Sequence, residues 1–149
     1  MTNRILLCTY EGEAYLEEQL ASIEGQTERN FRLLLSDDAS TDRSFVIGEA
    51  AAARDARITA IRRAERSGSA ARHFFEGLRD PRFFSAADES DYYLFSDQDD
   101  VWHPDKLAVE VRAMRCLEAR YGKELPLLVH CDMRVVDGAG REIAPSYVR

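Results

Sequence analysis

Short apolar runs alternate with segments of helical periodicity along most of the chain. Four runs have the length of buried or half-buried strands: residues 4–9, 31–36, 57–61 and 92–96. Three intervening segments carry helical patterns: residues 13–25, 44–54 and 70–78. The polar stretch at 80–91 indicates a loop. Repeated alternation of strand and helix predicts an α/β fold, with a mostly parallel sheet and helices on both faces.

The last third of the chain predicts one long helix, a further strand and a hairpin. Pro104 suits the first turn of a helix, and apolar residues at helical spacing continue to Leu117. The apolar run at 126–133 predicts a strand. The sequence DGAG at 137–140 lies between two short apolar segments, which is typical of a β-hairpin.

Length and composition limit the type of protein. At 149 residues the chain suits one domain, and 45% hydrophobic with 32% charged residues is an ordinary globular composition. No apolar run approaches the ~20 residues of a membrane-spanning helix, and no secretory signal is visible, so we expect a cytoplasmic location. Three widely spaced cysteines without a CxxC pair disfavour a zinc site or a disulfide framework.

The net charge of −7 narrows the range of partners. Nucleic-acid-binding proteins normally present a basic face, so we expect no nucleic acid to bind. An acidic protein that binds a phosphorylated ligand needs a metal ion or a basic patch to offset the repulsion. Arginines in the region 62–72 could supply that patch, with Ser67–Ser69 offering backbone N–H groups near a helix start. A solvated loop is the alternative.

Polar residues follow three of the predicted strands at the point where each strand ends. These segments are Thr9–Gly12, Asp37–Ser40 and Asp97–Asp100. In open α/β sheets, ligands bind in the crevice beyond the carboxyl ends of the strands, so we expect the three segments to share one site. Carboxylates brought together there raise each other's pKa or require a cation.

Asp97 and Asp99 are the candidate metal ligands. In an extended segment, residues two apart face the same side, with Cα atoms about 6.5 Å apart. Carboxylate oxygens suit Mg²⁺ or Mn²⁺, and Mg²⁺ typically takes one or two carboxylates together with substrate phosphates. Such a site fits a nucleotide diphosphate. The alternative is a solvated acidic turn that caps the helix near Pro104.

The other two strand ends are ambiguous by themselves. Asp37 and Asp38 could accept hydrogen bonds from a base or a ribose, or cap the following helix. Thr9, Tyr10 and Glu11 could line the site, or form an ordinary strand end beside a helix start. The chain carries no GxSxG, GxGxxG or GxxxxGK[ST] motif, which disfavours a serine hydrolase, a dinucleotide oxidoreductase and a P-loop kinase.

Four segments, taken together with their order and spacing, resemble the amino-terminal part of family 2 glycosyltransferases, which have the GT-A fold. They are residues 5–27, 31–44, 91–107 and 127–137. The strings FSDQDDVW and PDKL within 95–107 are particularly similar to bacterial rhamnosyltransferase-type members, which build surface polysaccharides. The resemblance implies that residues 1–149 form a nucleotide-sugar-binding domain of GT-A type, incomplete at its C-terminal end.

The resemblance also implies roles for individual residues. The residues expected to contact the nucleotide sugar are Thr9, Tyr10, Glu11, Asp37, Asp38 and Asp97. Asp99, with Asp97, would hold the Mg²⁺ or Mn²⁺ ion that binds the donor diphosphate. Family members often carry an NxG segment where this chain has Arg66-Ser67-Gly68, so the donor contacts there are expected to differ.

By the same resemblance, an acceptor hydroxyl deprotonated by a carboxylate would attack the anomeric carbon of the donor, with inversion. The acceptor would be a saccharide or a lipid-linked saccharide, and parts outside this chain would supply the catalytic base and any peripheral association with the inner face of the membrane. Two alternatives stay open. One is a sugar-phosphate nucleotidyltransferase, which normally needs a glycine-rich loop where this chain has Thr9–Gly12; the other is a non-catalytic nucleotide-sugar-binding module.

Overall fold

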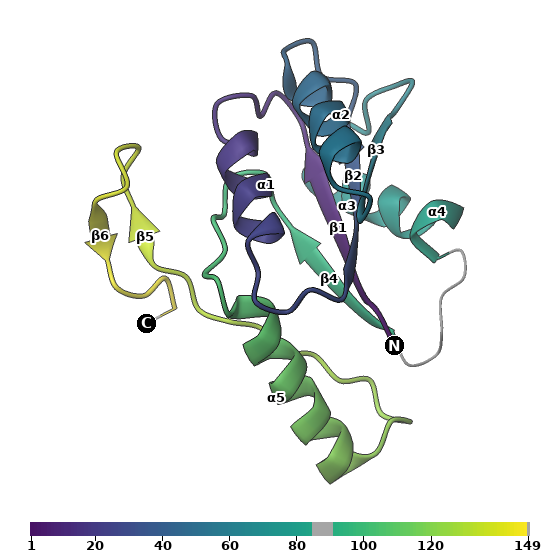
Figure 1. Ribbon diagram of the computed structural model, residues 1–149, viewed down its shortest axis with the longest axis vertical. Coiled ribbons are helices and arrows are strands. Elements are labelled where there is room, and N and C mark those ends of the chain that lie inside the picture. The colour runs from purple at the N-terminus through teal and green to yellow at the C-terminus, as the bar shows by residue number, and fades with distance from the viewer. Residues whose placement is uncertain (85–90, 149) are drawn as a thin grey trace. The chain divides into compact units, whose positions relative to one another are not determined.

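The computed structural model describes residues 1–84 and 91–148, and it contains two compact units. The first unit is Met1–Lys106 and holds a sheet flanked by helices; the second is Leu107–Arg149 and holds one long helix and a hairpin. Figure 1 shows the course of the chain through both. The candidate site lies in the first unit.

Four parallel strands form the sheet of the first unit. They are β1 (Asn3–Thr9), β2 (Phe31–Asp37), β3 (Ile58–Arg62) and β4 (Tyr92–Ser96), in the spatial order β3-β2-β1-β4. The central strand is covered on both faces, and Ile5, Leu6 and Leu7 are fully buried. A strand buried on both faces reads as a continuous apolar run, which is why the sequence pattern located it. The predicted parallel α/β sheet is confirmed.

Helices cover both faces of this sheet, as expected (Figure 1). On one face lie α1 (Leu16–Glu24) and α2 (Ser44–Arg54), and on the other lies α3 (Ala70–Leu78). The predicted loop at 80–91 contains a short helix, α4 (Pro81–Phe84), and residues 85–90 of that prediction lie outside the described residues. Because α1 leads from β1 to β2 while β4 lies on the other side of β1, the strand order reverses between β1 and β4. This reversal point is where open α/β sheets bind ligands.

Glycines let the helices approach the sheet closely. A Cβ atom on Gly48 of α2 would lie 2.9 Å from Leu35 Cδ2, and one on Gly77 of α3 would lie 2.8 Å from Leu6 Cδ2. On the α3 face, Leu6 packs in a core cluster with Cys8, Leu34 and Phe83. Leu34 joins the cluster on the α3 face, whereas the next residue of β2, Leu35, lies under α2, so successive strand residues send their side chains to opposite faces.

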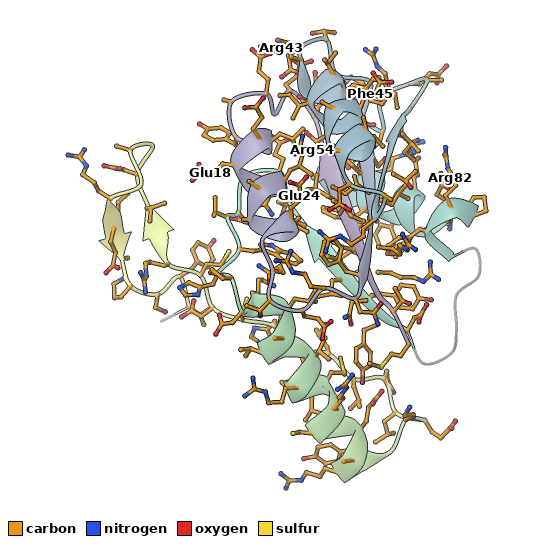
Figure 2. The ribbon with its side chains drawn as sticks, in the orientation of Figure 1. Glu18, Glu24, Arg43, Phe45, Arg54 and Arg82 are labelled. Atoms are coloured by element: carbon orange, nitrogen blue, oxygen red, sulfur yellow. The ribbon has the colours of Figure 1, made fainter. Side chains whose placement is uncertain are left out.

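An ion pair at the surface joins the two helices of one face. Arg54 at the end of α2 places its Nη2 atom 2.8 Å from Oε1 of Glu24 at the end of α1 (Figure 2). Both side chains are partly exposed, so such a pair adds only ~0.2–1 kcal/mol to stability. Apolar burial under the helices therefore carries the packing of this face.

The second unit contains α5 (Lys106–Tyr121), which starts at the last residue of the first unit, and an antiparallel hairpin of β5 (Val135–Val136) and β6 (Glu142–Ala144). The predicted hairpin is thus confirmed. Its turn is closed by Asp137, whose Oδ1 accepts the backbone N–H groups of Ala139 and Arg141. Within residues 1–84 and 91–148, no helix is long and apolar enough to span a lipid bilayer.

The predicted strand at 126–133 is wrong. These residues adopt no regular structure, and Leu128 is 80% exposed. An apolar run forms a strand only where a neighbour pairs with its backbone, and the two sheets of the described part contain no ladder to this segment. Asp132 bonds locally instead: its carboxylate accepts from the Ser146 hydroxyl and from backbone N–H groups, which lowers its pKa to about 2.

A matched pair of leucine substitutions tests the core. Leu7→Ala deletes a fully buried side chain at the centre of the sheet and should lower the free energy of unfolding by about 2–5 kcal/mol. Leu128→Ala removes the same atoms from an exposed position and should change it by less than about 0.5 kcal/mol. Urea denaturation followed by circular dichroism measures both. Equal losses in the two variants would contradict the described core.

Candidate functional site

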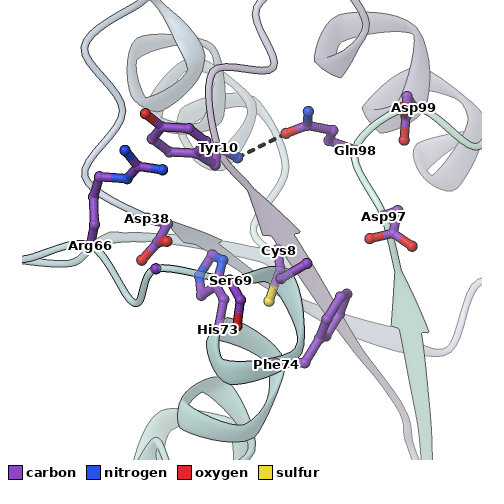
Figure 3. A pocket seen from close by; sticks show the side chains of 12 residues that line it. Cys8, Tyr10, Asp38, Arg66, Ser69, His73, Phe74, Asp97, Gln98 and Asp99 are labelled. Carbon is purple, nitrogen blue, oxygen red and sulfur yellow. Dashed lines mark hydrogen bonds between the residues drawn. The ribbon is translucent and has the colours of Figure 1, made fainter.

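A cavity of about 300 Å³ opens at the carboxyl ends of β1, β2 and β4 (Figure 3). This volume is at the lower end of the range for small-molecule sites. The N-terminus of α3 forms one side, and the segment after β4 forms the other. The residues that line it are Cys8, Tyr10, Asp38, Arg66, Gly68, Ser69, Ala70, His73, Phe74, Asp97, Gln98 and Asp99, all of which belong to the first unit.

The end of β1 brings Tyr10 into the cavity. The Arg66 guanidinium lies over the Tyr10 ring, with its carbon 3.8 Å from the ring centroid, in a cation–π contact. Thr9 is buried, and its hydroxyl donates to Gln98 Oε1 at 2.8 Å. The backbone N–H of Tyr10 donates to the same oxygen at 2.8 Å (Figure 3). Thr9 thus ties the loop together, whereas Tyr10 presents an aromatic surface to the cavity.

Glu11 joins the loops that follow β1 and β2. Its carboxylate accepts from the N–H and the hydroxyl of Thr41, at 2.8 and 3.0 Å, and its own N–H donates to Ser40 Oγ. Its side chain is therefore engaged outside the cavity. Glu11 and Ala39 both have left-handed backbones, with φ of 47° and 56°. Such conformations cost energy in residues other than glycine and often occur beside binding sites.

Asp37 and Asp38 are adjacent in sequence but have different surroundings. Asp37 is fully buried: its Oδ2 accepts the Ser40 N–H at 3.0 Å and lies 3.6 Å from Arg62 Nε. This turn-closing bond resembles the local role considered as an alternative for Asp37. Asp38 lines the cavity, and its two oxygens accept the N–H and the hydroxyl of Ser67, each at 2.7 Å.

Asp38 therefore holds the segment that forms the α3 side of the cavity. Ser67 lies between Arg66 and Gly68, and both of these line the cavity. The Nε atom of Arg63 lies 3.3 Å from Asp38 Oδ1 and supplies the opposing charge. Ser69 caps α3 by accepting the Arg72 N–H at 3.3 Å. Ser69 and Ala70 at the start of α3 line the cavity, and the N-terminus of a helix favours an anion.

Two buried polar side chains at the cavity are uncharged at neutral pH. Burial raises the pKa of the Cys8 thiol, and the carboxylates of Asp97 and Asp38 raise it further. Burial lowers the pKa of His73, whose Nε2 lies 2.9 Å from the Ser36 hydroxyl. Sequence reasoning missed both residues. For Cys8 a signal existed, because residues two apart on a strand share a face and Cys8 precedes Tyr10 by two.

The segment after β4 brings a second group of carboxylates to the cavity. Partial burial and the neighbouring carboxylates of Asp100 and Asp99 raise the pKa of Asp97. Burial and Asp99 likewise raise the pKa of Asp100, and Lys106 partly opposes this effect. Asp97 and Asp99 line the cavity while part of each side chain is in contact with solvent, and Asp100 follows directly, so negative charge is concentrated on this side of the cavity. An added cation would relieve the repulsion.

The carboxylates at the cavity suit a cation that takes some of its ligands from the protein and the others from a substrate. No cluster of three or more His, Cys, Asp or Glu side chains arranged around a metal position occurs in the described part of the chain. Asp97 and Asp99 alone could supply one or two carboxylates, which is the usual protein contribution to a Mg²⁺ site completed by phosphates and water. A closed all-protein metal cage does not fit these residues.

The structure places four of the seven predicted site residues on the cavity: Tyr10, Asp38, Asp97 and Asp99. Thr9, Glu11 and Asp37 lie next to it with side chains bonded to other protein groups. Their contacts with a ligand stay predictions. Gln98 was missed, because only the folded chain shows that an amide between two aspartates binds the β1 loop.

The family model for "Glycosyl transferase family 2" matches residues 4–119, which is most of the chain. The chain belongs to glycosyltransferase family 2. The earlier resemblance is therefore confirmed, and it includes a likeness to a rhamnosyltransferase. The dTDP-rhamnosyl transferase RfbG of Shigella flexneri is 33% identical over 112 residues, covering 74% of this chain and 36% of that protein.

Two solved structures show the same fold as this family 2 chain. TarS 1–349 from S. aureus superposes with a TM-score of 0.62 at 21% identity, covering 95% of this chain and 43% of that one. The mannosyltransferase PcManGT from Pyrobaculum calidifontis, solved with GDP-Man and Mn²⁺, gives a TM-score of 0.58 at 26% identity, covering 73% of this chain and 31% of that one. The chain thus spans 36% of its curated relative and less than half of these two structures.

The raised pKa of Asp97 leads to a prediction about stability and pH. A carboxyl whose pKa is higher in the folded than in the unfolded state destabilises the fold once it is ionised. Asp97→Asn should therefore raise the melting temperature at pH 7 in a chelating buffer. The gain should shrink as the pH falls towards the ordinary value of 3.8, where Asp97 is protonated in both states. Differential scanning calorimetry across this range provides the measurement.

The matched control is Asp105→Asn, which removes a carboxylate from the same connection, outside the cavity. This variant should show no pH-dependent rise in melting temperature. A lower melting temperature for Asp97→Asn at pH 7 would show that the ionised carboxylate stabilises the fold, contrary to this account.

Proposed function

We propose that this chain is the donor-binding part of a glycosyltransferase that moves a sugar from a nucleotide diphosphate to an acceptor hydroxyl. The observation that carries the proposal is a single cavity with an aromatic and basic wall opposite a carboxylate wall. Tyr10 and Arg66 belong to the first wall, and Asp97 and Asp99 to the second. Membership of family 2, and relatives named as a rhamnosyl and a mannosyl transferase, support it.

The donor would lie across the cavity with its nucleoside near Tyr10. An aromatic ring offers a stacking surface for a base, and the Arg66 guanidinium lies over the same ring. Among the described residues, no carboxylate of the cavity forms an ion pair with Arg66. The diphosphate would lie near Gly68 and Ser69, where the N-terminus of α3 contributes N–H groups. Thr9, Glu11 and Asp37 would then act by shaping the loops around the donor.

Asp99, with Asp97, would hold a divalent ion, Mg²⁺ or Mn²⁺. Asp97, Asp99 and Asp100 lie within four residues at the end of β4, and this supports the role; burial first, and then the neighbouring carboxylates, raise the pKa of Asp97 and Asp100. PcManGT was solved with Mn²⁺, and it is 26% identical to this chain. When bound, such an ion offsets the negative charge of a leaving diphosphate. The residues of the chain would orient the donor, which removes part of the entropic cost of reaction.

The reaction would be an inverting displacement in which an acceptor hydroxyl attacks the anomeric carbon and the nucleoside diphosphate leaves. The carboxylate that takes the hydroxyl proton is expected outside this chain. A saccharide or lipid-linked saccharide acceptor, and a place in bacterial surface polysaccharide synthesis, fit the likeness to a dTDP-rhamnosyl transferase. Membership of family 2 disfavours the nucleotidyltransferase alternative, as does the absence of a glycine-rich stretch at Thr9–Gly12.

Removing one metal ligand tests the proposal. Asp99→Asn keeps the size of the side chain but removes its charge, so Mn²⁺-dependent binding of a nucleotide sugar should fall by at least about tenfold, or 1.4 kcal/mol. Asp105→Asn, outside the cavity, should bind as the unchanged protein does. Isothermal titration calorimetry with and without Mn²⁺ measures both. Unchanged affinity in Asp99→Asn would remove the metal role.

A second assay separates turnover by this chain from binding alone. The protein is incubated with nucleotide sugars and Mn²⁺, and release of nucleoside diphosphate is followed. Binding together with release shows turnover by this chain itself. Binding without release, also after addition of saccharide acceptors, is the result expected when the catalytic base lies outside the chain.

A further inference from the structure

Helix α1 carries a line of polar residues that point into the protein. Gln19, Ser22 and Gln26 lie at positions i, i+3 and i+7, so they share one side of the helix and of the residues just after it. We refer to these three residues as the polar stripe. Gln19 and Gln26 are fully buried, and burying an amide costs free energy unless it is hydrogen-bonded.

Each residue of the polar stripe bonds to the last residue of β4 or to the connection between β4 and α5. Gln19 Nε2 donates to Ser96 Oγ at 2.7 Å, and Gln26 Nε2 donates to the carbonyl of His103 at 2.7 Å. Between them, the Trp102 N–H donates to Ser22 Oγ at 3.0 Å. The three bonds hold residues on both sides of the segment Asp97–Val101, which we call the carboxylate loop.

The first of these bonds continues into the loop. Ser96 Oγ accepts from Gln19 and donates to the carbonyl of Asp97 at 3.0 Å. A hydroxyl can do both at once, and linked hydrogen bonds strengthen one another. Gln19 thus acts on the backbone of a cavity residue that it does not itself touch. Ser22 likewise uses both functions, since its hydroxyl also donates to the carbonyl of Gln19 at 2.7 Å.

A second tether joins the carboxylate loop to the β1 loop. Gln98, between Asp97 and Asp99, accepts from the Thr9 hydroxyl and the Tyr10 N–H. The approach is so close that a Cβ atom on Gly12 would lie 2.4 Å from Gln98 Oε1. The loop is therefore fixed at both ends by the stripe and near its middle by Gln98.

The carboxylate loop needs such fixing for electrostatic reasons. It contains no regular secondary structure, and its three aspartates repel one another. Core packing does not explain the stripe, because the apolar side of α1, made by Leu16, Leu20 and Ile23, already fills the core. Apolar residues of similar size could fill the stripe positions without needing partners.

We propose that the polar stripe consists of positioning residues for the metal and diphosphate: it holds the carboxylate loop so that Asp97 and Asp99 face the cavity. This inference rests on the proposed function. Gln19, Ser22 and Gln26 are not among the residues that line the cavity, and they act through the loop. Gln98 couples the carboxylate side of the cavity to the Tyr10 side.

The test uses the double variant Gln19→Met and Ser22→Ala. Both changes remove the bonds to the loop while keeping helix formers of similar or smaller size. The apparent affinity for Mn²⁺ in the presence of nucleoside diphosphate should fall about tenfold, as expected when two hydrogen bonds of modest net strength are lost. Affinity for the unphosphorylated nucleoside should stay within about twofold, because it does not involve the carboxylates.

Trp102 supplies an independent readout of the loop. It is the single tryptophan of the chain, it is 5% exposed, and its backbone N–H donates to Ser22 Oγ. In the double variant without any ligand, the Trp102 emission should shift to longer wavelength, and acrylamide should quench it more strongly. The single variant Ser22→Thr retains both Gln19 and a hydroxyl at position 22. Its Trp102 emission and its Mn²⁺ affinity should therefore match those of the unsubstituted protein.

Two control variants separate positioning from stability. Glu18→Gln changes the solvent side of α1 (Figure 2) and should alter nothing. Leu20→Val weakens the apolar side of the helix, so it should lower the melting temperature while Mn²⁺ affinity and Trp102 emission stay unchanged. If Leu20→Val lowers Mn²⁺ affinity as much as the double variant does, stability alone explains the effect and the inference fails.

The outcomes for the two proposals differ. An unchanged protein that binds no nucleoside diphosphate at any Mn²⁺ concentration overturns the proposed function, and this inference with it. If the unsubstituted protein binds nucleoside diphosphate with Mn²⁺ and the double variant has the same Mn²⁺ affinity, the inference is overturned and the proposed function is not.

Discussion

Parallel pairing of β1 on both of its sides is the constraint on which the rest of the structure depends. Thr9 is in register with Asp37 of β2, and Leu7 is in register with Ser96 of β4. Since all three strands run in one direction, the polar residues that follow them emerge at a single edge of the sheet. The apolar residues of β1 stabilise this pairing by burial on both faces, and so the core of the protein and the location of the cavity have one cause.

Charge gives the two sides of the cavity different characters. On the α3 side, Asp38 is opposed by Arg63 and saturated by Ser67, so this carboxylate serves the protein itself. On the β4 side, raised pKa values for Asp97 and Asp100 show carboxylates held together at a cost to stability. Natural proteins accept such a cost mainly where function requires it. The two sides together suit a ligand that is negatively charged at its centre and arrives with a cation.

The sequence located the sheet and the strand ends because both follow from local patterns. A buried parallel strand is an apolar run, and the residue after it lies at the carboxyl edge, which is how Tyr10, Asp38, Asp97 and Asp99 were found. Local patterns could not tell Asp37 from Asp38, because their difference depends on Ser40 in one case and on Ser67, 29 residues away, in the other. The partners of Gln98 and His73 are equally remote in sequence. The strand predicted at 126–133 was wrong for the same reason, because an apolar run does not reveal whether a partner strand exists.

The left-handed backbones of Glu11 and Ala39 restrict how this site can vary among relatives. A residue other than glycine in that conformation costs about 1–2 kcal/mol, and a β-branched residue costs more. Valine or isoleucine should therefore be rare at both positions, whereas glycine should be tolerated there. Because these residues set the path of the two loops, substitutions there would disturb every contact with the ligand at once. Changes in ligand preference are therefore expected at positions such as Arg66 and Phe74, which line the cavity and whose side chains can change while the path of the chain stays the same.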